Sequence, residues 1–317
     1  MSQMTLAEIR RDDRFEGYLL VRAAEQRAAS SGKLYLDMTL SDKTGSINAK
    51  MWDGTVAPPA PGTVVLVRAT GTEFNGRMQL RVERVRPVAA GEPVDMSALV
   101  PCAPEDPQAM RDAVQAAAQA ISDPDIRAVV LELLRLAGDA LLTFPAAKQM
   151  HHAERSGLLH HMTGMLRAAQ AMEEVYPFLN PDLLNAGVII HDLAKISEMN
   201  ADSLGMVQDY TTEGKLIGHI VRGVVDIHRA GERVGAAPDK VLLLEHMVLS
   251  HHGVPEFGSP IAPKFPEAEV LNVLDTLDAR MNEMLEALRR TLPGGFSEKV
   301  WAMDNRQLYR IPDARLE

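Results

Sequence analysis

The chain has 317 residues, which is long enough for two domains, and carries a formal net charge of −10. It contains no run of 18 apolar residues and no apolar stretch near its start, so we expect neither a membrane-spanning helix nor a signal peptide. Its single cysteine, Cys102, excludes an intrachain disulfide and favours a cytoplasmic protein.

The first part of the chain, from Phe15 to Val88, has the periodicity of a β-protein. Asn75-Gly76 is a hairpin signal, and a proline-rich stretch at 58–62 interrupts the pattern once. Four segments show the alternation of side chains that is typical of strands: residues 34–40, 46–52, 63–69 and 78–85. Together with a first strand near Phe15, they favour a small barrel over a sandwich. We therefore predict an OB-like barrel domain at residues 1–89.

Residues 90–107 are rich in Pro, Gly and Ala without a period, which predicts a linker. Beyond it, apolar residues recur at helical spacing, and Asp106-Pro107 and Asp123-Pro124 are helix-start signals. Helices are expected to continue through Arg290. We therefore predict an all-α domain at residues 108–317.

Charge and histidine are distributed unevenly along the chain. Residues 1–90 contain 13 Lys and Arg against 10 Asp and Glu, whereas residues 91–317 contain 20 against 33. All ten histidines lie between His151 and His252. This concentration indicates a metal site in the helical domain, although the acidic balance there does not favour a nucleic-acid ligand.

The His191-Asp192 pair follows an apolar helical run. Burying an imidazole and a carboxylate is costly unless they are hydrogen-bonded or bound to an ion. A donor set of nitrogen and oxygen without thiolate suits Mn, Fe, Co, Ni or Zn. Lys195 is expected one helical turn after His191 on the same face, where it would meet a phosphate.

Five fragments in the same order resemble the HD phosphohydrolase superfamily: residues 157–161, 189–195, 218–220, 245–253 and 274–278. In that superfamily a His…His-Asp…Asp pattern supplies the metal ligands. The resemblance assigns these ligands to His161, His191, Asp192 and Asp275. Members with two or three metals add further histidines, which correspond to His219, His251 and His252. The resemblance therefore implies one or two divalent ions, Mg included, with Asp192 as the bridging ligand where a second ion is bound.

The order of the domains narrows the resemblance. An OB-like module followed by an HD domain is similar to the YhaM-type 3′–5′ exoribonucleases, from about Phe15 to Tyr309. The similar motifs are Pro145-Ala146-Ala147, His151-His152-Ala153, Thr212 to His219, Leu249 to Gly253, Gly258-Ser259-Pro260 and Pro266-Glu267-Ala268. One departure is Gly157, which stands where dinuclear HD-GYP phosphodiesterases have a metal-bridging Glu. The resemblance implies single-stranded RNA, or single-stranded DNA, as the partner and cleavage from the 3′ end.

Candidate substrate contacts lie in both domains. The barrel offers aromatic side chains for base stacking and basic side chains for phosphates: Tyr35, Trp52, Phe74, Lys50 and Arg77. In the helical domain, His152 is the best candidate for a substrate contact among the remaining histidines. Asp192 and Lys195 are the candidate catalytic residues.

The sequence thus favours a metal-dependent phosphodiesterase, an exoribonuclease with the barrel as its RNA grip. Two alternatives remain open. A nucleotide or cyclic-dinucleotide phosphohydrolase would use the same ligands and suits the acidic helical domain better. The other alternative is a non-enzymatic OB-fold nucleic-acid-binding protein. The complete set of metal ligands argues against it. The sequence also leaves open whether the chain forms homo-oligomers.

Overall fold

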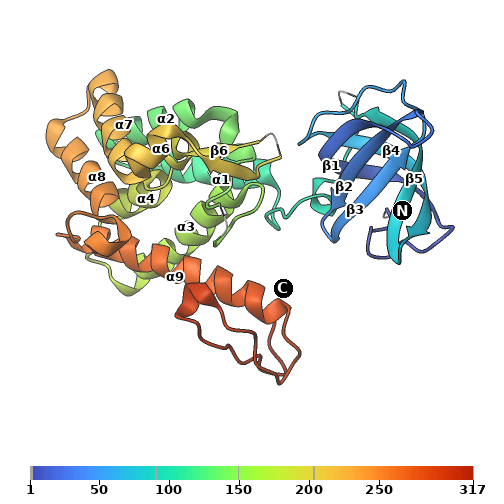
Figure 1. Ribbon diagram of the computed structural model, residues 1–317. Coiled ribbons are helices and arrows are strands. Elements are labelled where there is room, and N and C mark those ends of the chain that lie inside the picture. The colour runs from blue at the N-terminus through green and yellow to red at the C-terminus, as the bar shows by residue number, and fades with distance from the viewer. Residues whose placement is uncertain (1–2, 90, 149, 203, 317) are drawn as a thin grey trace. The chain divides into compact units, whose positions relative to one another are not determined.

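A computed structural model describes residues 3–89, 91–148, 150–202 and 204–316. The chain forms two compact units, Met1–Cys102 and Ala103–Glu317 (Figure 1). Each has its own hydrophobic core. Among the described residues, no helix combines the length and the apolar character needed to cross a membrane.

The first unit is the predicted barrel. Its strands are β1 (Arg14–Ala28), β2 (Leu34–Asp42), β3 (Gly45–Met51), β4 (Val64–Phe74) and β5 (Arg77–Pro87). They close in the order β1-β2-β3-β5-β4, with β3 and β5 parallel and all other neighbours antiparallel. This is the OB-fold arrangement, and the prediction is confirmed.

Local sequence explains how the barrel closes. The β4–β5 turn has Asn75 and Gly76 at φ 51° and 73°, the left-handed pair that a tight hairpin requires. A bulge between Val21 and Ala23 bends the long β1, which pairs with β4 in its first half and with β2 in its second. One strand thereby serves two neighbours.

The segment after β5 is partly attached to the barrel. The hydroxyl of Tyr18 donates to Glu92, and the guanidinium of Arg86 pairs with the same carboxylate. The limits of a linker at 90–107 between domains 1–89 and 108–317 stay a prediction.

The second unit is helical, as predicted. Its helices are α1 (Pro107–Ala120), α2 (Pro124–Ala137), α3 (Gly157–Val175), α4 (Pro181–Ile190), α5 (Lys195–Glu198), α6 (Thr212–Leu216), α7 (Gly218–Val234), α8 (Pro238–Ser250) and α9 (Pro266–Arg289). The side chains of Asp106, Asp123 and Asn180 cap α1, α2 and α4, each followed by a proline in the first turn. Helix α4 is buried along almost its entire length and lies in the middle of the core, so its C-terminal end is delivered inside the unit.

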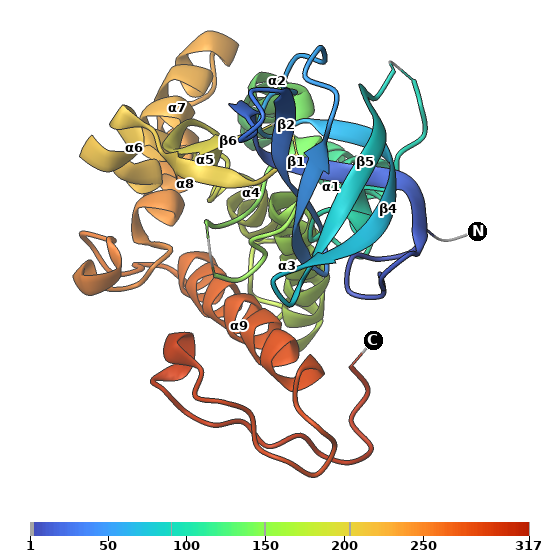
Figure 2. The ribbon, with the colours of Figure 1, turned by 45° about the vertical axis from the view of Figure 1, so that its right-hand side comes forward.

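Two features depart from continuous helix. A small hairpin of β6 (Met199–Ala201) and β7 (Val207–Tyr210) follows α5, where helix was expected. The side chain of Asp202 accepts from the backbone of Leu204 and Met206 and stabilises the turn instead of a helix. After α9 the chain returns in an irregular hairpin beside that helix, which Figure 2 shows in red.

Candidate metal centre

The ends of three helices and the sides of two others bring the seven predicted ligands together. His161 comes from α3 and Asp275 from α9, while His219 lies in the first turn of α7. The two adjacent pairs, His191-Asp192 and His251-His252, directly follow α4 and α8. A cluster of polar groups is thus assembled at the edge of an apolar core.

The first group surrounds the Nε2 atom of His161. This atom lies 3.2 Å from Nε2 of His191, 3.2 Å from Oδ1 of Asp275 and 3.8 Å from Oδ2 of Asp192. His161, His191 and Asp192 are at most 1% exposed. Two imidazoles and two carboxylates therefore share a small buried space, which is the donor chemistry of a divalent metal site.

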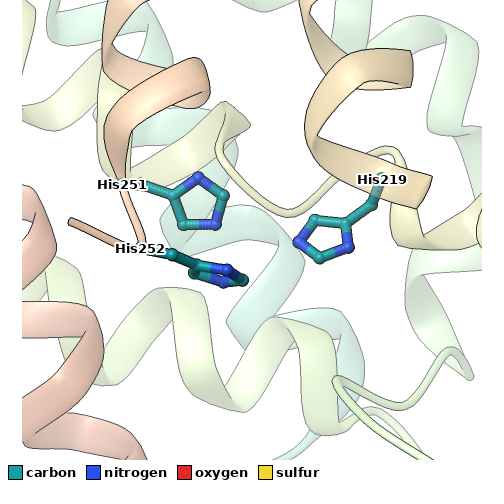
Figure 3. A group of neighbouring side chains, drawn as sticks. All are labelled: His219, His251 and His252. Carbon is teal, nitrogen blue, oxygen red and sulfur yellow. The ribbon is translucent and has the colours of Figure 1, made fainter. Parts of the chain in front are cut away.

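The second group consists of His219, His251 and His252, whose rings converge from α7 and from the end of α8 (Figure 3). The other carboxylate oxygen of Asp192, Oδ1, lies 3.6 Å from Nε2 of His219 and 3.9 Å from Nε2 of His251. Asp192 therefore presents one oxygen to each group. One carboxylate therefore lies within reach of both groups of imidazoles.

Three of these buried atoms have no hydrogen-bond partner within the described part of the chain: Asp192 Oδ1, His219 Nε2 and His251 Nε2. An unpaired buried carboxylate oxygen between two unpaired imidazole nitrogens is costly without a further group. A cation would satisfy all three atoms. The residues present therefore fit a divalent metal.

Hydrogen bonds on the far side of each ring fix which nitrogen faces the centre. The Nδ1–H groups of His191 and His251 donate to the carbonyls of Val188 and Val248, at 2.9 and 2.7 Å. His252 donates in the same way to a loop carbonyl. Because a carbonyl only accepts, the proton of each neutral ring is on Nδ1, and Nε2 keeps its lone pair for a metal.

Two carboxylates orient the remaining rings, those of His161 and His219, in the same way. The sequence analysis did not assign a role to either carboxylate. Asp278 Oδ2 lies 2.7 Å from Nδ1 of His161, and Glu198 Oε1 lies 2.9 Å from Nδ1 of His219. Asp278 comes one helical turn after Asp275 on α9, and this i, i+3 spacing is the signal that could have identified it. Glu198 has no comparable signal, because its distance from His219 is set by the β6–β7 hairpin.

Neighbouring charged groups of the centre shift one another's pKa values toward the charged forms. Burial alone would raise the pKa of Asp192, but the ammonium of Lys195 and the imidazole of His191 outweigh it and hold the pKa well below its usual value. Burial would lower the pKa of His161, whereas Asp275 and Asp278 raise it to about 9 in the absence of an ion. The pKa of Asp275 is also lowered, by His161 and His191, so both carboxylates are ionised and ready to bind a cation.

Lys195 is placed differently from the expectation. Helix α4 ends at Ile190, and a tight turn separates it from α5, so Lys195 does not continue the helical face of His191. Its buried ammonium instead lies 2.6 Å from Oδ2 of Asp192. Lys195 is thus a direct neighbour of Asp192.

Steric crowding explains why position 157 is a glycine. A Cβ atom at this position would lie 2.0 Å from the carbonyl oxygen of His152. Backbone cannot yield as a flexible side chain can, so no side chain fits at this position. Any metal here is bound without a ligand from position 157.

The remaining histidines divide into two sets. His151, His152 and His160 lie beside the centre, where the ring of His151 is 5.7 Å from that of His161 and Nε2 of His152 is 2.8 Å from Asp278. His246 accepts from the backbone of Lys264, and His228 lies on the surface near Glu245, so both are accounted for by local contacts.

In the barrel, the five predicted substrate contacts lie close together. The rings of Tyr35 and Trp52 are 4.9 Å apart, and the ammonium of Lys50 lies 5.6 Å from the ring of Tyr35 and 5.8 Å from that of Phe74. Arg77 is paired with Phe74 across the β4–β5 hairpin and lines a hollow together with Lys50. Trp52 and Phe74 are about half exposed, at 48% and 59%. Exposed aromatic rings beside cations are the groups that stack on nucleobases.

Comparison with known proteins supports a metal site in this unit. Residues 158–280 match the HD domain family. Relatives named 3′-5′ exoribonuclease YhaM occur in Bacillus licheniformis (38% identity over 92% of this chain and 93% of that protein), Geobacillus sp. strain WCH70 (39%, 92% and 90%) and Bacillus subtilis strain 168 (37%, 94% and 95%). The fold and the site define an HD-domain hydrolase, a metal-dependent enzyme. The chain belongs to the YhaM family of 3′–5′ exoribonucleases.

Solved structures give a weaker likeness. A replication protein A heterotrimer bound to ssDNA is 20% identical and matches 24% of this chain and 57% of that chain, with a TM-score of 0.20. The second OB-fold domain of replication protein A from Methanococcus maripaludis is 15% identical and matches 30% and 100%, with a TM-score of 0.24. A likeness at this level says nothing about a ligand.

We predict that Asp278→Asn weakens metal binding while the protein stays folded. The amide cannot hold the Nδ1–H of His161 as a carboxylate does, and loss of such a partner typically lowers metal affinity about 10–100-fold. Titration of metal-free protein with Mn²⁺, with circular dichroism as the folding check, measures the effect. Asp304→Asn, an 81% exposed side chain, is the control. Equal affinity in Asp278→Asn and wild type would contradict the role given to Asp278.

Proposed function

We propose that this protein is a metal-dependent 3′–5′ exoribonuclease that hydrolyses single-stranded RNA. The observation that carries the proposal is Asp192, buried and directed with one oxygen toward each of two histidine groups. The relatives named exoribonuclease, which match more than nine-tenths of the chain, support RNA as the substrate. The exposed aromatic and basic side chains on the barrel support a single-stranded polymer.

The ligands would be divided between two ions. His161, His191, Asp192 and Asp275 would hold the first, and His219, His251 and His252 would hold a second, with Asp192 shared. The donors suit Mn, Fe, Co, Ni, Zn or Mg. Such ions supply Lewis acidity, which polarises a phosphoryl oxygen and makes water a better nucleophile at neutral pH.

Residues of the protein would orient the metal ligands and stabilise charge on the phosphate. Glu198 and Asp278 hold the rings of His219 and His161, so the ligand nitrogens are oriented before substrate arrives. Lys195 lies beside the carboxylate around which the ligands gather, and its ammonium would stabilise charge on the phosphate as the bond breaks. His152 remains a candidate for a substrate contact.

The barrel would supply grip rather than chemistry. Tyr35, Trp52 and Phe74 would stack on bases, and Lys50 and Arg77 would contact phosphates. The ligands of the centre all belong to the other unit. Long RNA and a small phosphodiester should therefore depend on the barrel to different extents.

One observation favours a second candidate. Residues 91–317 have 13 more acidic than basic residues, which suits a small nucleotide or cyclic dinucleotide better than a polymer. Turnover of an RNA oligomer compared with bis-p-nitrophenyl phosphate and a nucleotide panel separates the two. A cytoplasmic location, inferred from the single cysteine, and the oligomeric state stay part of the proposal to be tested.

The first prediction concerns Asp192. Asp192→Ala, and the similarly shaped Asp192→Asn, should abolish hydrolysis and lower the bound metal, because one side chain serves both groups of ligands. Metal analysis, circular dichroism and turnover of RNA are measured on the same preparations. Wild-type turnover by a folded, metal-free variant would refute the assignment.

The second prediction concerns Lys195. Lys195→Met removes a positive charge beside the ligands and should leave the metal content unchanged. It should lower kcat by about 10²–10³, the usual effect of losing one preorganised contact to the transition state. The loss should be larger in kcat than in KM. Loss of metal, or a kcat within a few-fold of wild type, would show that Lys195 has no such role.

The third prediction concerns the barrel. The double variant Lys50→Glu, Arg77→Glu should weaken binding of long single-stranded RNA and lower its salt dependence, by roughly 0.7 in the log–log slope for each lost phosphate contact. Hydrolysis of bis-p-nitrophenyl phosphate should not change. The matched control is Arg11→Glu, Lys43→Glu, which makes the same change of charge at exposed positions of the same barrel. An equal effect of both double variants on RNA would mean that net charge, not this face, is responsible.

A further inference from the structure

A second cluster of ligand-type side chains lies beside the centre, in the segment before α3 and in its first turn. Nδ1 of His160 lies 2.8 Å from Oε1 of Glu154 and 3.1 Å from Nδ1 of His152, and the latter two atoms are 3.7 Å apart. The three side chains are only 18%, 20% and 4% exposed. A point equidistant from the three atoms lies about 2 Å from each, which is the length of Zn–N and Zn–O bonds.

The tautomer of His152 leaves a possible ligand atom in this cluster. Nε2 of His152 lies 2.8 Å from Asp278, so a neutral ring that donates there has a lone pair on Nδ1, the atom that lies near His160 and Glu154. A cation at this point would be bound by the Nδ1 atoms of both rings and by the carboxylate of Glu154.

The backbone holds His152 in place. Its φ of 52° is in the left-handed region, which is uncommon for a residue with a side chain. Asn282 on α9 accepts from its backbone N–H at 3.0 Å, and the amide nitrogen of Asn282 lies 3.4 Å from Nδ1. The strained conformation is therefore stabilised from a separate helix, as is common at binding sites.

Glu154 is in the form that a metal requires. Burial would raise the pKa of its carboxyl, but the neighbouring imidazoles of His152 and His160 lower it to about 2. The side chain is thus an anion in a pocket with two imidazoles.

We propose that His152, Glu154 and His160 form a separate binding site for one divalent cation of the zinc type. Two imidazoles and one carboxylate are a common zinc donor set that leaves a fourth position open. The site differs from the centre in all three ligands. It does not depend on the proposed exoribonuclease activity.

The new site is coupled to the centre through one atom. Oδ2 of Asp278 accepts from His152 at 2.8 Å and from His161 at 2.7 Å. A cation on Nδ1 of His152 would strengthen its Nε2–H as a donor, so Asp278 would be less available to orient His161. Occupancy of the site therefore acts on a ligand of the centre without contacting it.

The test counts metal ions. Metal-free full-length protein is dialysed against Zn²⁺ and its metal content measured for wild type, Glu154→Gln and His160→Gln. Each variant should bind one equivalent less than wild type at Zn²⁺ concentrations that saturate the wild-type protein. Mg²⁺, which prefers oxygen ligands, should show no difference between the proteins. Circular dichroism checks folding, and two independent variants guard against a local defect of either one.

Glu174→Gln is the matched control, because Glu174 is an exposed acid on the same helix as His160. It should bind as many equivalents as wild type. Equal Zn²⁺ content in all four proteins overturns the proposal. Loss of every equivalent together in Glu154→Gln also overturns it, since the cluster would then be an outer part of the centre rather than a site of its own.

Discussion

The helical unit depends on the burial of one carboxylate. Asp192 is 1% exposed, and a charge so deeply buried is tolerated only among compensating groups. Each neighbouring element supplies part of the compensation, since α5 contributes Lys195, while α7 and the end of α8 contribute imidazoles. The apolar helix α4 positions the carboxylate by ending inside the core. The fold can therefore be understood as a set of helix ends arranged around a charge that none of them could hold alone.

One local device orients two of the ligands. His191 and His251 each follow a helix, and each donates to the carbonyl three residues earlier, Val188 or Val248. The last carbonyls of a helix lack partners within it, so a histidine placed there satisfies one of them and turns its other nitrogen away. A histidine at a helix terminus thus satisfies a backbone carbonyl and at the same time directs its other nitrogen toward the centre.

Much of this could be predicted from the sequence. The barrel followed from alternation and the Asn75-Gly76 turn. The candidate ligands, which lie as far apart along the chain as His161 and Asp275, were assigned through the resemblance to the HD superfamily. The partners of the ligands could not be predicted in the same way. The contact of Glu198 with His219 depends on the β6–β7 hairpin, which is determined by turn chemistry at Asp202 rather than by hydrophobic period. Lys195 was misplaced because periodicity alone does not show that α4 stops at Ile190.

The order of the ligands along the chain has a consequence for synthesis. The centre draws on residues from His161 to Asp275, and the last of them lies on α9. During translation the barrel is complete long before α9 exists, whereas the first carboxylate–imidazole cluster lacks Asp275 and Asp278 until that helix has left the ribosome. Because domains fold as units during synthesis, the barrel can be folded while the centre still lacks its last carboxylates.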